Sequence, residues 1–162
     1  MPLIKDGAFQ EDTFVTVADG EPMPLNGTIV SLARFQAERE TLLARNSKLG
    51  VRLKSSESPE ILGKDVHRLS AIVLEFPFFK DGRPFSWARI LRTRMNYEGE
   101  IRAAGHFLYD QIAFATRVGF DSFEVPEGFT LNQFTRALSE MSYVYQPSTD
   151  ARKTIRDLRA AH

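Results

Sequence analysis

The chain has 162 residues, of which 43% are hydrophobic and 26% are charged, and this size and composition fit one globular domain with a full hydrophobic core. Its 21 lysines and arginines balance 21 acidic residues, so no net charge draws it to nucleic acid or to an anionic membrane. Because the chain has no cysteine, disulfides, thiolate catalysis and cysteine-bound zinc or iron–sulfur clusters are excluded.

The N-terminal residues 1–14 contain no continuous apolar segment like that of a signal peptide. Nowhere in the chain do about eighteen apolar residues follow one another, as a membrane-spanning helix would require. Neither secretion nor a membrane span is therefore indicated, and we expect a cytoplasmic protein.

The chain begins with a predicted hairpin over residues 1–17. The turn pair Asp6-Gly7 divides a short apolar start from residues 14–17, whose side chains alternate in character. Residues 20–27 contain two prolines and are predicted to form a loop. A strand over residues 28–33 and a helix over residues 34–46 are predicted to follow.

The middle of the chain is predicted to contain the central strand. Residues 49–54 form a strand, and Ser58 followed by Pro59 indicates a helix start, with serine as the cap and proline in the first turn. Residues 68–76 then contain a nearly continuous apolar run, which is typical of a strand buried on both faces. We therefore expect residues 68–76 to lie at the centre of the sheet.

The remaining elements are marked by helix caps. After a loop over residues 77–84, Ser86 is expected to cap a helix that runs to Met95, and Gly119 is expected to end a later helix in the left-handed conformation. The residues Thr-Leu-Asn-Gln at 130–133 form a capping-box pattern. Together with the apolar periodicity, these signals predict a strand at 100–104, a helix at 106–118, a strand at 121–125, a helix from 130 onward and a candidate last strand at 143–146.

The alternation of strands and helices predicts an α/β fold with parallel strands joined by right-handed crossovers. We expect one domain over residues 1–147, in which a mostly parallel sheet, either open or a partial barrel, is preceded by the N-terminal hairpin. A complete eightfold barrel is excluded, because it typically requires about 250 residues. Residues 148–162 are assigned to a charged C-terminal tail with a short docked or fraying helix.

The turn Asp81-Gly82-Arg83 is the first candidate for an anion site. It lies at the carboxyl end of the buried strand and just before a helix start, where backbone amides and the helix dipole favour an anion. Arg83 would add a bidentate partner for phosphate, sulfite, sulfate or carboxylate. The alternative is a tight turn with an exposed arginine, since Asp-Gly is a common turn pair.

Two further arginines extend this candidate site. Arg89 stands three residues before Arg92 and could share one helical face with it, although the same face could simply be solvated. Arg102 lies in a strand whose period of two places it beside Glu100, and charges on a covered strand require partners. The candidate anion-binding residues are therefore Asp81, Arg83, Ser86, Arg89 and Arg102.

Glu75 interrupts the apolar run near the end of its strand. If that strand neighbours the strand of Arg102, we expect Glu75 and Arg102 to form a buried or half-buried ion pair. Such pairs are usually structural, but carboxylates at strand ends are also candidate acids or bases. Glu75 and Asp110 are therefore the candidate catalytic residues.

Neither a metal nor a nucleotide is indicated by the sequence. His106 and Asp110 stand four residues apart, a spacing that two metal ligands can use but that is common by chance. We expect no metal site. The chain has neither a GxGxxG nor a GxxxxGK[ST] motif, so the identity of any cofactor stays open.

At these residues the chain resembles a family of uncharacterised bacterial proteins, domain of unknown function 934, which is often labelled an oxidoreductase linked to sulfite reduction. The resemblance implies a place in assimilatory sulfate and sulfite metabolism through gene neighbourhood, and it supplies no established active site. Tyr109 stands where many relatives are expected to carry a basic residue. The stretches that carry the resemblance are MPLIKDG at the start, LGVRL at 49–53, DGR and FSWAR within 81–89, YEGEIRAAG at 97–105, DQ at 110–111 and RVGFDSFEV at 117–125.

Three hypotheses about function follow. The leading one is an accessory or small-anion-binding protein that acts with a sulfite reductase. The second is an enzyme on a small anionic substrate, with Glu75 or Asp110 as its acid or base. The third is an interaction subunit without a ligand, docking through the charged tail and the aromatic residues around 76–87. The oligomeric state stays open.

Overall fold

The computed structural model describes residues 1–139, so the candidate strand at 143–146 and the charged tail lie outside the described residues. Eight strands form one sheet: β1 (Leu3–Lys5), β2 (Ala8–Gln10), β3 (Phe14–Thr16), β4 (Gly27–Ser31), β5 (Leu49–Leu53), β6 (Ala71–Phe76), β7 (Glu100–Gly105) and β8 (Ser122–Glu124). The helices are α1 (Leu32–Ala37), α2 (Arg39–Leu43), the 3-10 helix η1 (Pro59–Arg68), α3 (Arg83–Thr93), the 3-10 turn η2 (Tyr109–Gln111), α4 (Ile112–Val118) and α5 (Leu131–Ser139).

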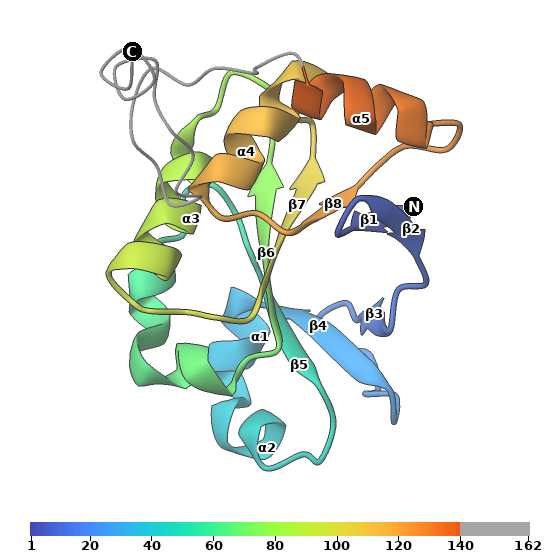
Figure 1. Ribbon diagram of the computed structural model, residues 1–162. Coiled ribbons are helices and arrows are strands. Elements are labelled where there is room, and N and C mark those ends of the chain that lie inside the picture. The colour runs from blue at the N-terminus through green and yellow to red at the C-terminus, as the bar shows by residue number, and fades with distance from the viewer. Residues whose placement is uncertain (140–162) are drawn as a thin grey trace.

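The strand order is β2-β1-β8-β7-β6-β5-β4-β3. Strands β3 to β8 are parallel and follow one another in sequence order, whereas β1 runs antiparallel to both β8 and β2. Because every parallel strand is added on the same side of the previous one, right-handed crossovers place the connecting helices on one face of the sheet. Figure 1 shows α3 and α4 on one side of β6 and β7, with the N-terminal strands on the other. The predicted single α/β domain with a mostly parallel sheet is confirmed.

The sheet is curled into a half-barrel. Its two edge strands, β2 and β3, are joined by residues 11–13 alone, so the span from Gln10 to Phe14 is at most about 14 Å. The edges of a flat sheet of this many strands would lie roughly 33 Å apart. The short connection therefore requires the edges to approach each other, and Figure 1 shows β2 and β3 on the same side of the molecule. Of the two predicted forms, the partial barrel is the one adopted.

The two faces of the sheet have different contents. Side chains of β6 at Ile72, Leu74 and Phe76 join the large core beneath the helices. The alternate residues Ala71 and Val73 face the hollow of the curl, where they form a second apolar cluster with Phe14, Ile29 and Ala104. The prediction that this strand is central and buried on both faces is confirmed.

The N-terminal hairpin is confirmed at its turn, but its second strand differs from the one expected. Asp6 and Gly7 both have positive φ, as a tight two-residue hairpin turn requires, and they join β1 to β2. Residues 14–16 form β3 instead, which pairs in parallel with β4 at the far edge. Alternating residues indicate a strand without specifying its partner, which explains the error.

Several helix boundaries also differ from the expectation. Helix α3 begins at Arg83, so Ser86 lies within the helix and is not its cap; Pro84 in the first turn and the side chain of Asp81 mark the start. The helix expected at 34–46 is divided at Glu38 into α1 and α2. Among the described residues, no helix is long and apolar enough to cross a membrane.

The predicted stop at Gly119 is confirmed. The residue has a φ of 122° and ends α4 with its amide donating to the carbonyls of Ala115 and Thr116. The capping box at Thr130 and Gln133 is also confirmed, because each side chain accepts a hydrogen bond from the other's backbone amide.

Candidate functional site

The Asp81–Arg83 turn lies at the carboxyl end of β6, as expected, but its charges pair with each other. The Arg83 guanidinium donates to both Asp81 carboxylate oxygens, at 3.0 and 2.8 Å, and the Arg83 amide donates to the same side chain at 3.1 Å. Arg83 Nη2, which donates to one of these carboxylate oxygens, also donates to Ser55 Oγ at 3.0 Å. Hydrogen bonds from Arg83 hold the pKa of Asp81 well below its ordinary value. The chain's own carboxylate thus takes the position expected for a bound anion.

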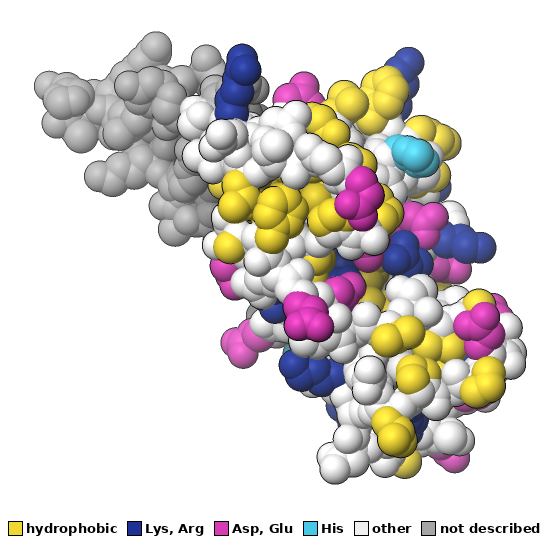
Figure 2. Space-filling model, turned by 90° about the vertical axis from the view of Figure 1, so that its right-hand side faces the viewer, with side chains coloured by type: hydrophobic (Ala, Val, Ile, Leu, Met, Phe, Trp, Pro, Cys, Tyr) yellow, Lys and Arg dark blue, Asp and Glu magenta, His cyan; other side chains and the backbone are white. Residues whose placement is uncertain are grey.

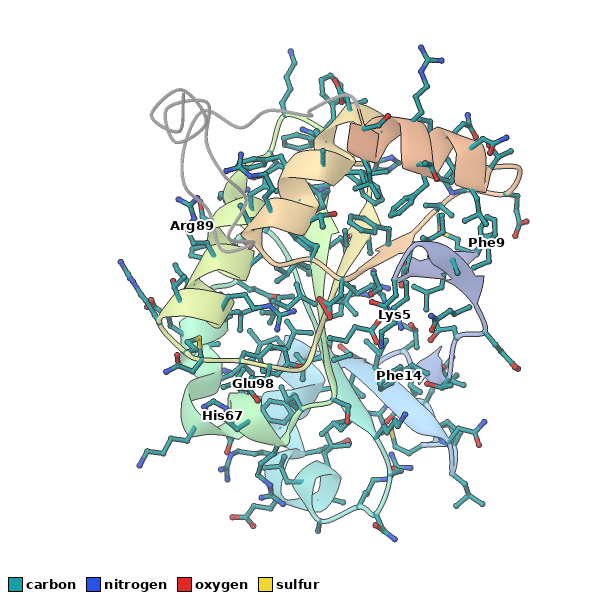
Figure 3. The ribbon with its side chains drawn as sticks, in the orientation of Figure 1. Lys5, Phe9, Phe14, His67, Arg89 and Glu98 are labelled. Carbon is teal, nitrogen blue, oxygen red and sulfur yellow. The ribbon has the colours of Figure 1, made fainter. Side chains whose placement is uncertain are left out.

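Ser86 and Arg89 are exposed on α3 and do not join this pair. Arg89 lies on the outer side of its helix in Figure 3. Arg92, by contrast, bonds the carbonyl oxygens of Tyr97, Gly99 and Gly119 at 2.7 to 3.1 Å, together with the Asp121 carboxylate at 2.6 Å. Arg89 and Arg92 therefore do not form one anion-binding face.

Arg102 lies inside the curl of the sheet and is matched by carboxylates. Its side chain is 1% exposed, and its guanidinium donates to Glu100 at 3.0 Å and to the two oxygens of Asp12 at 2.7 and 3.1 Å. The Phe14 ring lies 5.6 Å from the guanidinium carbon. Phe14 comes from the edge strand β3 and Lys5 from β1, next to the opposite edge, and Figure 3 shows the two on the same side of the sheet.

The expected ion pair between Glu75 and Arg102 is not formed. Their strands are neighbours, but Arg102 stands opposite Val73 and turns toward Glu100 and Asp12. The charged partner of Glu75 is Arg52 of β5, at 3.6 Å. No local pattern places the exposed residues 11–13 over the sheet, so Asp12 could not be predicted as the competing carboxylate.

Three charged residues meet at the carboxyl ends of the parallel strands, and we call them the mouth cluster: Arg52, Glu75 and Glu124. Arg52 Nη2 donates to Glu124 at 3.3 Å although β5 and β8 are three strands apart, which is possible because the sheet is curled. Arg102 lies beneath the cluster, 3.6 Å from Glu124. The side chains of Arg52, Glu75 and Glu124 are 26%, 39% and 14% exposed, so solvent reaches the cluster from one side.

The Arg52 guanidinium is incompletely paired. Its Nε is buried and has no hydrogen-bond partner among the described residues, and its contact with Glu75 is longer than a hydrogen bond. Beside it in register stands Ser31 of β4, whose hydroxyl donates to Asp19 at 2.6 Å. The cluster therefore has a spare donor surrounded by acceptors.

A cavity of about 580 Å³ opens where these strands end, and we call it the mouth cavity. Gly105 in its wall directly follows Ala104, which is in register with Glu75, and Pro126 lies two residues beyond Glu124. Figure 2, which views the molecule from the side of the N-terminal strands, shows acidic and basic side chains gathered across the middle of that side, with apolar patches above and below them. The lining residues are Met1, Gly105, His106, Phe107, Leu108, Tyr109 and Pro126.

Asp110 is exposed and lines a neighbouring hollow of about 210 Å³, which shares Tyr109 with the mouth cavity. His106 lines the mouth cavity instead, so the two residues of the possible metal pair face different hollows. No group of three or more histidine, aspartate or glutamate side chains suited to a metal ion occurs in the described part of the chain. A further hollow of about 450 Å³, which includes Lys64, His67 and Arg94, lies toward the amino ends of β6 and β7.

The interior charges are ionised at neutral pH. Burial raises the pKa of Asp12, but hydrogen bonds from Arg102 and from the Phe14 amide, together with the positive charge of Arg102, leave the pKa below its ordinary value. Burial likewise raises the pKa of Glu100, but hydrogen bonds from Ser122 and Lys5, together with the positive charges of Arg102 and Lys5, leave it below its ordinary value. The network therefore holds fixed charges beneath the mouth cluster.

Sequence reasoning identified Glu75 but not its two companions, Arg52 and Glu124. Both are charged residues in short apolar strands, LGVRL and SFE, at the same carboxyl end as Glu75. Like Glu75, each of them is a charged residue near the carboxyl end of an apolar strand, so the same pattern in the sequence indicates all three. Their convergence follows from the curl, which the sequence alone does not specify.

A family model described as "Bacterial protein of unknown function (DUF934)" matches residues 50–156, a range that includes all three residues of the mouth cluster and begins after Asp12. No curated protein and no solved structure matches the chain.

Proposed function

This chain belongs to DUF934, a family of bacterial proteins of unknown function, and we propose that it binds a small molecule through an anionic group at the mouth of its curled sheet. The supporting observation is the Arg52 guanidinium, whose buried Nε lacks a hydrogen-bond partner among the described residues. A buried donor without an acceptor is unfavourable by about 1–3 kcal/mol. An anion at the mouth would remove that penalty, because a planar guanidinium can donate two parallel bonds to it.

The position of Arg52 favours the same proposal. In folds built of successive parallel strand–helix units, sites lie at the carboxyl ends of the strands, where loops can vary without disturbing the sheet. This sheet adds its parallel strands in one direction, so it has no point of reversal that would provide a crevice elsewhere. The mouth cavity of about 580 Å³ is within the range of small-molecule sites.

Titration of the protein with sulfite, sulfate and phosphate tests the proposal. We expect saturable shifts of the backbone amide resonances around Arg52, and a roughly 10- to 100-fold weaker affinity in Arg52→Gln. Arg89→Gln is the matched control, since Arg89 is exposed on the outer side of α3. Equal losses in the two variants would show only a general effect of charge and would contradict a site at Arg52.

We further propose that the protein acts as an accessory to a sulfite reductase, with sulfite or sulfate as the first anions to test. The support for this step is the resemblance noted in the sequence, which implies a place in sulfite metabolism through gene neighbourhood. Co-purification with the reductase, and reductase activity with and without this protein, provide the test. An unchanged activity and no co-purification would remove the accessory role and leave the anion site to be judged by titration.

An enzyme is the second candidate, because Glu75 is half-exposed and lies beside Arg52, at a strand end where an acid or base could reach a bound molecule. In that case Glu75→Gln would still bind the substrate but would not turn it over. Asp110→Asn would retain turnover. Turnover that survives in Glu75→Gln would exclude this residue as the acid or base.

A further inference from the structure

The mouth of the sheet carries more negative than positive charge. Arg52 is flanked by Glu75 and Glu124, and Asp19 is held at the next strand end by Ser31. The positive charge beneath them, on Arg102, is already matched by Asp12 and Glu100. A free anion at Arg52 would therefore gain one guanidinium but would lie beside carboxylates that repel it.

The two carboxylates nearest Arg52 differ in how firmly they are held. Glu124 accepts a hydrogen bond from Arg52 at 3.3 Å and is largely buried. Glu75 lies 3.6 Å from Arg52, makes no recorded hydrogen bond among the described residues, and is the most exposed of the three. Glu75 is thus available to accept from a ligand that enters from the solvent side.

The wall of the mouth cavity adds a third property. Among the described residues, its lining is apolar at Met1, Phe107, Leu108, Tyr109 and Pro126, and His106 adds a polar side chain. Glu124 lies two residues before Pro126 of this lining, and Glu75 is in register with Ala104, which directly precedes Gly105. The cavity therefore begins beside the mouth cluster, and a molecule held at the cluster would extend its remainder toward it. Burial of an apolar group there would contribute to affinity in proportion to its area.

We propose that the ligand of this site is a zwitterion of amino-acid size, with its anionic group on Arg52, its ammonium group on Glu75 and an apolar substituent in the mouth cavity. This inference rests on the proposed function and refines it, since it names the class of molecule that carries the anion. Such a ligand gives a hydrogen-bond acceptor to Arg52 Nε and a hydrogen-bond donor to Glu75, whose contact with Arg52 is longer than a hydrogen bond. A simple anion satisfies only the first of these groups.

The test compares four probes at fixed ionic strength: sulfate, ethylammonium, glycine and phenylalanine. Affinity is measured from the amide resonances of residues 52, 75 and 124. We expect phenylalanine to bind most tightly, glycine more weakly, and sulfate and ethylammonium at least about tenfold more weakly than phenylalanine. Sulfate that binds as tightly as phenylalanine at these residues would overturn the inference while leaving the proposed anion site intact.

Charge-neutral variants separate the two halves of the ligand. Glu75→Gln should lower the affinity for phenylalanine about tenfold and leave that for sulfate equal or higher, because a repelling charge is removed. Glu98→Gln is the matched control, because Glu98 is an exposed glutamate. In Figure 3 it lies left of centre, whereas Lys5 lies right of centre. If the Glu75 variant keeps its full affinity for phenylalanine, the ammonium contact is wrong. No resonance shift at the mouth with any probe would contradict both this inference and the anion site.

Discussion

Arg102 illustrates how a single buried charge can organise the interior of a sheet. Its guanidinium forms hydrogen bonds with carboxylates from β7 and from the connection between β2 and β3, which are 2 and 90 residues away in sequence. Taking such a charge out of water is unfavourable by several kcal/mol unless its partners surround it. The ion pair between Arg102 and Asp12 therefore holds the connection at residues 11–13 against the middle of the sheet.

A double-mutant cycle measures the coupling free energy between Arg102 and Asp12. Arg102→Met should destabilise the protein by about 3–5 kcal/mol, because Glu100 and Glu124 lose their buried partner. Asp12→Ala should have a smaller effect, since Asp12 is partly exposed. We expect the two losses of free energy of unfolding to be non-additive by at least about 1 kcal/mol in denaturant titration. Strict additivity would mean that the pair contributes no coupling.

Asp121 gives the stability of the protein a pH dependence of unusual sign for an acid. Burial raises its pKa to about 6, although Arg92 lies 2.6 Å away and lowers it. In the unfolded chain the group loses its proton near pH 3.9. Between these values the folded protein retains a proton that the unfolded chain has released, so this group's stabilising contribution falls as pH rises.

The variant Asp121→Asn isolates that contribution. As pH rises from about 4 to 7, the stability of the wild-type protein should fall relative to the variant by up to about 3 kcal/mol. Asp12, Asp81 and Glu100 act in the opposite direction, because their lowered pKa values contribute stability that is lost on acidification. Their contribution is common to both proteins and cancels in the difference. A pH-independent difference would show that Asp121 is ionised throughout.

At the scale of elements, the end of α4 depends on the absence of a side chain at Gly119. The residue has positive φ, and a Cβ built there would lie 2.5 Å from Arg92 Cγ, within the side chain that joins α3 to the loops before β7 and β8. Gly119 is thus required for two reasons: the end of the helix needs positive φ, and the Arg92 side chain occupies the space that a Cβ would fill.

Gly119→Ala and Gly128→Ala form a matched pair that separates these two requirements. Both glycines have positive φ, but nothing lies within 4 Å of a Cβ at Gly128. We expect Gly128→Ala to lower the free energy of unfolding by about 1 kcal/mol, and Gly119→Ala to lower it by at least about 2 kcal/mol more. Thermal unfolding of the two variants provides the comparison; equal losses would show that Arg92 can move aside without a penalty.

Elements could be predicted from local signals but their partners could not. The glycine stop at 119, the turn at Asp6-Gly7 and the capping box at Thr130 each act within a few residues, and all three are present. Ser86 was misassigned because a proline two residues earlier gives a competing helix start. Residues 14–16 were recognised as a strand, but the choice of β4 over β2 as the neighbour is made by the whole sheet.

At the scale of the molecule, the curl determines the candidate site. Glu75 could be selected from the sequence because it interrupts an apolar strand, and parallel strands bring their carboxyl ends together. That Arg52 would reach Glu124, and that Asp12 would displace Glu75 from Arg102, depends on the distance between strands that are not neighbours. Such distances follow from curvature, for which local sequence carries no signal.

The three-residue connection between the edges offers a test of the curl. Four glycine and serine residues inserted after Glu11 should destabilise the protein by at least about 2 kcal/mol, whereas the longer loop alone would cost only about 0.8 kcal/mol in closure entropy. The same insertion after the exposed Leu25, in the loop between β3 and β4, serves as the control. Comparable small losses at both positions would indicate that the curl persists without a tight connection.

The edges of the sheet are also among its shortest strands, since β2 and β3 each contain three residues. An exposed edge is a template on which another chain can add a strand, and long, flat edges are where β-proteins begin to aggregate. Here each edge offers only a few unpaired amides, and the connection at residues 11–13 draws both edges toward each other. We therefore expect this half-barrel to resist edge-to-edge assembly into fibrils, although both edges of its sheet are open.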